Sequence, residues 1–214
     1  ESLRCLVGSE MCIRDSSSYS EINREQEEAV MNVHELVAMM AAANASDDPT
    51  QAIAEAMASL TDDLPGLAET LSYLPGTGGN ARQAFFRSPD LSLLKVNFPN
   101  GRRTPPHNHG TWATILLLAG QEKNTIYKRG ADGRLERDKV VELKPGDIVH
   151  IPAECAHVAE CTGSEPAIGL HVYGANVLGI ERSMWNPETL EELPLDWTAY
   201  EPLAQKASAM AGAP

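Results

Sequence analysis

"TPPHNHGTWATILLLAG", residues 104–120, sets two histidines one residue apart just before a continuous apolar run. The run predicts a buried strand. In extended backbone, His107 and His109 point to the same side because side chains alternate, so both imidazoles can reach one metal ion. A His-x-His pair alone does not establish a metal site, and further ligands have to come from elsewhere in the chain.

Short β-rich segments surround this stretch from residue 81 to about residue 186, and turn signals such as RGADGR and KPGD separate them. Closely spaced short strands of this kind are typical of a β-sandwich or a barrel. We expect strands at about residues 83–88, 91–98, 105–109, 112–119, 122–129, 134–142, 147–151, 156–162, 167–173 and 177–183.

A helical region is predicted ahead of the strands, over residues 17–80. Apolar residues recur there at helical spacing among many helix formers. Asp47 or Asp48 can cap a second helix, and Pro49 suits its first turn. The glycine-rich loop at residues 75–80 cannot continue a helix, so we place the boundary of the barrel there.

The two ends of the chain are expected to lie outside the barrel. Residues 187–214 predict an irregular tail with a fraying end. The segment LVGSEMCIRDS resembles the translation of a sequencing-library adaptor, so we expect residues 1–16 to be foreign to the protein. Cys155 and Cys161 are then the native cysteines, too few for a disulfide scaffold, which fits a reducing compartment.

Charge and hydropathy exclude several classes of partner. The chain carries a formal net charge of -13, whereas nucleic acids and anionic membranes select clustered lysine and arginine. No apolar run approaches the roughly 20 residues that a membrane-spanning helix needs. We therefore expect no nucleic-acid partner, no membrane partner and a cytoplasmic location.

Glycine, proline and histidine recur at set intervals in two motifs. The residues are Gly101, His107, His109 and Gly120 in the first motif, and Gly146, Pro152 and His157 in the second. The two motifs resemble the signatures of the cupin family, G-x5-H-x-H-x3-4-E-x6-G and G-x5-P-x-G-x2-H-x3-N. The resemblance implies a mainly β fold, a double-stranded β-helix or jelly-roll barrel over residues 81–186, with the histidines of both motifs as metal ligands.

The first motif lacks its glutamate, because Ala113 or Thr114 stands in that place, depending on the spacing taken. The second motif has Glu154 for its inner glycine and Cys161 for its asparagine. Three neutral imidazoles leave the full charge of a divalent ion uncompensated, which favours anionic ligands. A thiolate suits such a site, since metal binding lowers the pKa of a thiol.

The segment AIGLHVYG aligns Gly169, His171 and Tyr173 on one face of a strand. This arrangement resembles the cysteine dioxygenase type of cupin, the thiol dioxygenases, whose strand carries Ser-x-His-x-Tyr beside a three-histidine iron. The resemblance implies that Tyr173 and His171 are catalytic and that the cofactor is Fe(II). Gly169 replaces the serine, and Thr114 stands near the family's cross-linking cysteine, so we expect no thioether.

In that family an arginine or a glutamine on an early strand holds the substrate carboxylate. Arg82 and Gln83 stand at a matching distance before the first motif, and either can serve. The resemblance implies a dioxygenase that oxidises a small thiol acid, of the cysteine or 3-mercaptopropionate type, to a sulfinate with O2. The oligomeric state is not predicted.

Two other functions are compatible with the same residues. The first is a non-catalytic cupin that binds a metal or a small anion as a sensor. The second is a zinc or manganese cupin that works as an isomerase or hydrolase. Cys155 lies two residues before His157 and could complete a zinc site, although inert packing is the ordinary role of a free cysteine.

Overall fold

The computed structural model describes residues 33–72, 74 and 82–211. The expected foreign segment at residues 1–16, the beginning of the helical region up to residue 32 and the expected boundary loop at 75–80 lie outside the described residues. Within the described part of the chain, no helix is long and apolar enough to cross a membrane.

The described helices confirm the expected N-terminal helical region. Residues 33–44 are helical and are followed by α2 (Pro49–Ala58), η1 (Thr61–Asp63) and α3 (Leu64–Thr70). The carboxylate of Asp48 accepts a hydrogen bond from the Gln51 backbone N–H and caps α2. Of the two predicted candidates, Asp47 and Asp48, it is Asp48 that caps the helix.

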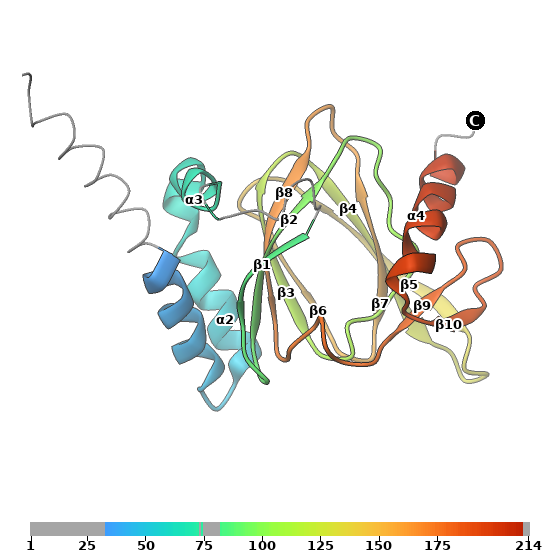
Figure 1. The fold of residues 1–214 in the computed structure, drawn as a ribbon, viewed down its shortest axis with the longest axis horizontal. Coiled ribbons are helices and arrows are strands. Elements are labelled where there is room, and N and C mark those ends of the chain that lie inside the picture. The colour runs from blue at the N-terminus through green and yellow to red at the C-terminus, as the bar shows by residue number, and fades with distance from the viewer. Residues whose placement is uncertain (1–32, 73, 75–81, 212–214) are drawn as a thin grey trace, which may run out of the picture.

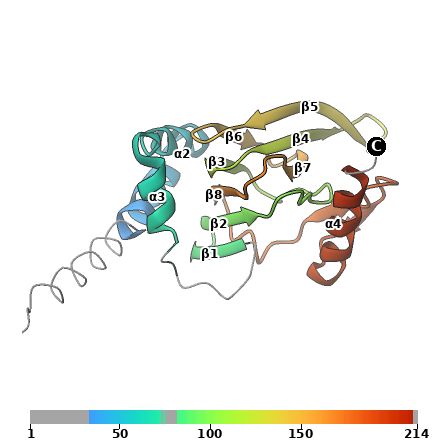
Figure 2. The same cartoon turned by 90° about the horizontal axis from the view of Figure 1, so that it is seen from above.

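Two antiparallel sheets form the barrel (Figure 1). Figure 2 shows β4 and β5 in one layer and β1 and β2 in the facing layer. The five-stranded sheet has the order β1 (Arg82–Arg87), β2 (Ser92–Phe98), β8 (Ala167–Tyr173), β3 (Ala113–Ala119), β6 (Ile148–Ile151), and the three-stranded sheet has the order β5 (Leu135–Leu143), β4 (Glu122–Arg129), β7 (Ala156–Cys161).

Two expected strands are wrong. Residues 105–109 form no strand, because Pro105 and Pro106 have no N–H to give to a ladder. An isolated bridge replaces it, in which His107 and His157 exchange two backbone hydrogen bonds of 3.0 and 2.8 Å. Residues 177–183 are also irregular up to β9 (Ser183–Trp185), which pairs with β10 (Glu192–Pro194).

The expectation of an irregular tail over residues 187–214 is wrong as well. Besides β10, this segment contains the helix α4 (Trp197–Ala211), which lies on the side of the barrel opposite α2 and α3 (Figure 1). The Asp196 carboxylate accepts the Thr198 backbone N–H at the start of α4. Tyr200, Ala204 and Ala207 are buried at helical spacing and fix α4 against the barrel.

The five-stranded sheet separates two hydrophobic cores. On its inner face, Ile115 and Leu117 of β3 belong to the core of the barrel. On its outer face, Leu116 of β3 and Leu170 of β8 pack against the helical layer, which contributes residues such as Met57. Because β3 is buried on both faces, its sequence is a continuous apolar run.

Candidate metal centre

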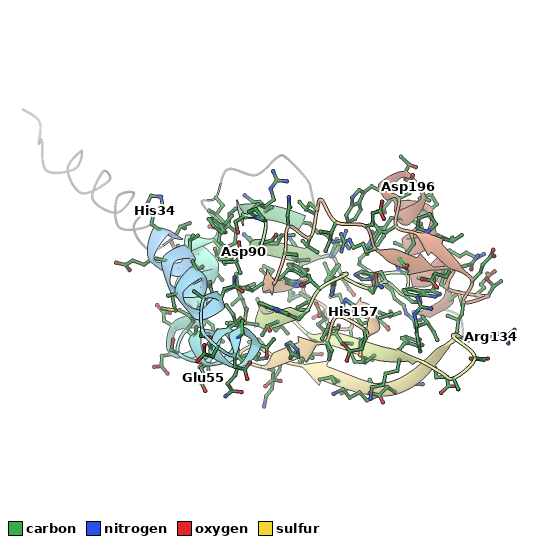
Figure 3. The ribbon with its side chains drawn as sticks, turned by 90° about the horizontal axis from the view of Figure 1, so that it is seen from below. His34, Glu55, Asp90, Arg134, His157 and Asp196 are labelled. Atoms are coloured by element: carbon green, nitrogen blue, oxygen red, sulfur yellow. The ribbon has the colours of Figure 1, made fainter. Side chains whose placement is uncertain are left out.

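Three buried histidines from two segments of the barrel domain lie close together. His107 and His109 come from the loop before β3, and His157 comes from β7. Their ring centroids are 4.6 Å apart for His107 and His157, 4.9 Å for His109 and His157, and 5.2 Å for His107 and His109. Each ring offers one nitrogen, and these three atoms lie within 4.8 Å of one another. Figure 3 labels His157 in the interior of the molecule, far from surface residues such as Glu55 and Arg134.

Hydrogen bonds fix which nitrogen two of the rings present. His107 Nδ1 lies 3.0 Å from the Pro105 carbonyl oxygen, which can only accept, so this nitrogen carries the proton. His157 Nδ1 lies 2.8 Å from Asn124 Oδ1 and donates in the same way. Both rings therefore present an unprotonated Nε2, and His157 Nε2 faces His109 Nε2 at 3.3 Å. Such a set of convergent lone pairs fits a divalent metal ion.

The electrostatics of the cluster keep the three rings neutral, as metal ligation requires. Burial lowers the pKa of His107 and His109 well below the usual value, and the neighbouring rings lower it further. Burial, followed by the charges of Arg82 and Arg182, lowers the pKa of His157 to about 3. Protons therefore do not compete with a metal ion for these nitrogens near neutral pH.

The missing glutamate of the first motif corresponds to Ala113. Ala113 is fully buried in the barrel core and is the register partner of Tyr173. Thr114 is on the opposite face of β3, where its hydroxyl contacts His150 Nδ1 at 3.2 Å. Among the described residues, neither a carboxylate nor Cys155 belongs to the group of potential ligands.

His171 and Tyr173 stand beside the cluster on the inner face of β8. His171 Nδ1 and the Tyr173 hydroxyl are 3.0 Å apart, and the Tyr173 ring is 5.0 Å from that of His109. Burial raises the pKa of Tyr173 to about 12, so its hydroxyl keeps its proton. The departure at Gly169 has a steric reason, because a Cβ there would lie 2.9 Å from His171 Nε2. A serine in this place would force the His171 ring to move.

The two candidate substrate residues point in different directions. Gln83 donates to the Leu74 carbonyl oxygen at 2.9 Å, away from the histidines. Arg82 donates to the Tyr200 hydroxyl at 2.5 Å, and its guanidinium lies 5.3 Å from the centre of the Trp197 ring. The Tyr200 ring lies 5.9 Å from the His107 ring, so Arg82 is near the cluster, and its positive charge lowers the pKa of His107 and His157.

A second arginine, Arg182, was missed in the sequence. It precedes β9, and its guanidinium also lies 5.3 Å from the Trp197 ring. Burial lowers the pKa of Arg182, and its charge lowers the pKa of all three histidines of the cluster. Asn108 binds the backbone of Ser183 through its own N–H and its side-chain oxygen, which ties this segment to the histidine loop. No local pattern predicts such a long-range contact.

Glu122 and Asn124 of β4 were also missed. Both are fully buried, Asn124 Nδ2 donates to Glu122 Oε1 at 2.7 Å, and Asn124 accepts from His157. Burial raises the pKa of Glu122 to about 7. The only sequence signal is a polar pair at alternate positions of a strand, which ordinarily indicates a solvent-exposed face.

Comparisons with known proteins agree on the fold. Residues 94–173 match the family model described as Cupin domain, and this segment holds all three histidines together with His171 and Tyr173. The match and the two antiparallel sheets confirm the predicted cupin double-stranded β-helix with N-terminal helices.

The solved structures that match part of the chain are diverse. An RmlC-like cupin family protein from Methanocaldococcus jannaschii is 13% identical, with 49% of this chain and 89% of that chain covered and a TM-score of 0.38. An uncharacterized protein from Klebsiella pneumoniae is 20% identical, with 57% and 89% covered and a TM-score of 0.38. Hydroquinone 1,2-dioxygenase PnpCD is 13% identical, with 44% and 63% covered and a TM-score of 0.37. Likenesses of this size assign no activity to the chain.

Proposed function

We propose that the protein is a non-haem iron(II) dioxygenase that oxidises the thiol of a small thiol acid to a sulfinate with O2. The observation that carries the proposal is a ligand set of three neutral histidines with two arginines beside it. In the net reaction the S–H bond is replaced by two S–O bonds, and sulfur supplies the electrons that reduce dioxygen. No external reductant is needed.

The charge of the site selects an anionic substrate. Three neutral imidazoles leave a divalent ion with its full charge, and Arg82 and Arg182 add two further positive charges nearby. A thiol acid brings a carboxylate and, once its thiol is deprotonated, a second anionic group. Iron(II), when bound, would supply the redox chemistry with dioxygen and thiolate that no side chain here provides.

The two arginines would bind the substrate carboxylate. Each guanidinium presents several N–H donors in a fixed plane, and stacking on Trp197 restricts how each one turns. Arg82 gives one donor to Tyr200, and its guanidinium carries further N–H donors of the kind that bind a carboxylate. A carboxylate held between the two arginines would fix the direction in which the thiol points towards the histidines.

Tyr173 and His171 would supply a proton donor beside the ligands. The raised pKa of Tyr173 means that its hydroxyl donates a hydrogen bond to an anionic neighbour without losing its proton. His171 Nδ1 limits the positions of this hydroxyl through their mutual contact. The pair would therefore hold a hydrogen-bond donor on a ring that lies 5.0 Å from that of His109.

The proposal is tested on protein reconstituted anaerobically with iron(II) and assayed in an oxygen electrode. The substrates are cysteine, 3-mercaptopropionate and cysteamine, which lacks a carboxylate, and the product is identified by mass. We expect oxygen uptake and sulfinate formation with at least one of the two acids. Absence of oxygen uptake with every thiol would reject the dioxygenase and favour a sensor, whereas zinc or manganese in protein made without added metal would favour the isomerase or hydrolase.

The role of the arginines has its own test. Arg82→Gln and Arg182→Gln should each raise KM for the preferred thiol acid by roughly 10- to 100-fold, because each removes a charge-assisted hydrogen bond. Activity with cysteamine should change little. Arg134→Gln serves as the control, since Arg134 lies on an exposed turn far from the histidines. An equal loss with cysteamine would show that the arginines do not bind the carboxylate.

A further inference from the structure

Two consecutive hydrogen bonds connect His157 through Asn124 to the buried Glu122. His157 Nδ1 contacts Asn124 Oδ1 at 2.8 Å, and Asn124 Nδ2 contacts Glu122 Oε1 at 2.7 Å. The relative exposures of these side chains are 2%, 0% and 1%, so water does not compete for the hydrogen bonds. The register between β4 and β7 fixes the positions of these residues, because Asn124 is opposite Ala159 and Glu122 is opposite Cys161.

These two hydrogen bonds determine which ring nitrogen of His157 carries the proton. An amide can present either its oxygen or its NH2 group to a neighbouring ring. Because the Glu122 carboxylate accepts from the NH2 group of Asn124, the amide oxygen is turned to His157 and accepts from Nδ1–H. Nε2 then carries the lone pair. An amide turned the other way would donate to Nδ1 and move the proton to Nε2, where it would block ligation.

The same carboxylate supplies a charge that the ligands lack. Ala113 occupies the place of the glutamate in the first motif. Among the acidic side chains that the structure describes, only Glu122 is buried. It lies behind the ligands and not among them, so it can offset part of the charge of a metal ion without occupying a coordination position.

We propose that Glu122 is a positioning residue of the metal centre, which fixes the metal-binding tautomer of His157 through Asn124 and supplies the negative charge missing from the ligand set. The proposal rests on the metal-binding part of the proposed function and is independent of thiol oxidation.

The surroundings of Glu122 make its charge responsive to the metal. Burial raises the pKa of its carboxyl group to about 7, opposed only by the hydrogen bond from Asn124. The titratable groups facing it are Cys161, its register partner on β7, and Tyr173 of β8, whose pKa its charge raises. On β5 its partner is the apolar Leu143. A divalent cation nearby favours the carboxylate, so metal binding near pH 7 should release a proton from Glu122.

The experiment measures Co²⁺ binding to the metal-free full chain by calorimetry and by the visible spectrum of the bound ion. Two variants separate the roles of Glu122. Glu122→Gln keeps an oxygen that accepts from Asn124 and removes the charge, whereas Glu122→Met removes both. Glu160→Gln is the matched control, since Glu160 is an acid of the neighbouring strand that pairs with Lys123 instead of facing the barrel interior.

We expect Glu122→Met to weaken Co²⁺ binding by roughly 10- to 100-fold and to change the spectrum, as outer partners of metal-bound histidines do. Glu122→Gln should keep the wild-type spectrum. The proton released on binding at pH 7, measured in buffers of different ionisation enthalpy, should be lower by about half a proton in Glu122→Gln, because a group with a pKa near 7 is half protonated there. Glu160→Gln should match the wild type.

The outcomes distinguish this proposal from the one before it. Wild-type affinity and spectrum in Glu122→Met would overturn the positioning role, and undiminished proton release in Glu122→Gln would overturn the charge role. If Glu122→Met does not fold, Glu122→Gln still tests the charge role, and Asn124→Leu tests the positioning role by the same readouts. Failure of the wild type to bind Co²⁺ would reject the metal centre itself. Co²⁺ binding without thiol oxidation would reject only the dioxygenase and would leave the role of Glu122 standing.

Discussion

The two faces of the five-stranded sheet are built from the same strands, but the outer face packs against the helices and the inner face carries polar residues beside the metal centre. The outer face packs apolar side chains such as Leu116 and Leu170 against the helices, and its buried Thr114 hydroxyl has a partner in His150. The inner face is apolar along much of β3 but carries His171 and Tyr173 on β8. Strand alternation alone assigns each residue to one face or the other.

The difference between the faces concerns how well polar groups are satisfied. His109 Nδ1 and His171 Nε2 are buried without a hydrogen-bond partner among the described residues. Glu122 is held in a site that disfavours its charge. Each of these costs free energy in the metal-free protein, and the outer core compensates for the cost. Substitutions on the outer face should therefore destabilise the apoprotein strongly, and substitutions in the site should not.

The largest loss is expected from Leu116→Ala on the outer face. Leu116 is fully buried between β3 and the helical layer, so truncation should lower the free energy of unfolding of the apoprotein by about 2–5 kcal/mol. Chemical denaturation measures this loss. Leu178→Ala, at a residue that is 37% exposed, should change stability by less than about 0.5 kcal/mol. A Co²⁺ affinity that fell in folded Leu116→Ala would show that the two faces are coupled.

The second-largest effect is a pH dependence of the stability of the apoprotein, caused by Glu122. Its folded-state pKa of about 7 lies above the ordinary value of 4.5, so the folded protein favours the protonated form. Protonation of Glu122 therefore contributes to the free energy of unfolding. This contribution, about 3 kcal/mol at most, is fully present below about pH 4.5 and is lost as the pH rises through 7. Wild-type apoprotein should lose this stability relative to Glu122→Gln between pH 5 and pH 8, as measured by urea denaturation with a chelator present. Parallel pH curves for the two proteins would refute the raised pKa.

The strands of the two barrel sheets, β1 to β8, were predictable because their signals are local, whereas β9 and β10 were not predicted. β3 is buried on both faces and is therefore continuously apolar, and the turns at Gly133 and Gly146 have positive φ angles of 80° and 92° that suit glycine. The helix α4 was missed because the end of the chain was expected to fray, and Pro202 inside it is unfavourable for a helix. Pro202 is the sixth residue of the helix and cannot donate to the Thr198 carbonyl oxygen, so the packing of Tyr200, Ala204 and Ala207 has to offset this loss.

The metal ligands were predictable from motif spacing, but their supporting residues were not. Asn124 and His157 are 33 residues apart, and only the register of β4 and β7 brings them together. Arg182 reaches the site because β9 pairs with the histidine loop through an isolated bridge at Met184. Such contacts depend on how strands pair across the barrel, so the periodicity within one segment of the sequence cannot predict them.

A smaller effect on stability is expected from Tyr173→Phe. This change removes the hydroxyl that contacts His171 Nδ1, and a single buried hydrogen bond contributes about 1 kcal/mol. If the hydroxyl acts as the proton donor, turnover of the thiol acid should fall while its KM changes little. Turnover equal to the wild type would remove Tyr173 from the catalytic residues and leave it as a packing residue.

The smallest effect on the apoprotein is expected from His109→Leu, although it removes a proposed metal ligand. Leucine has a similar volume, so its packing should cost less than about 1.5 kcal/mol. The substitution also removes a buried Nδ1 that has no partner among the described residues, which offsets a cost of about 1–3 kcal/mol. Denaturation of the apoprotein should therefore give a free energy of unfolding near that of the wild type, while Co²⁺ binding is lost. A large loss of stability would mean that the ring of His109 is part of the barrel's packing, and that the inner face serves the fold as much as the outer face does.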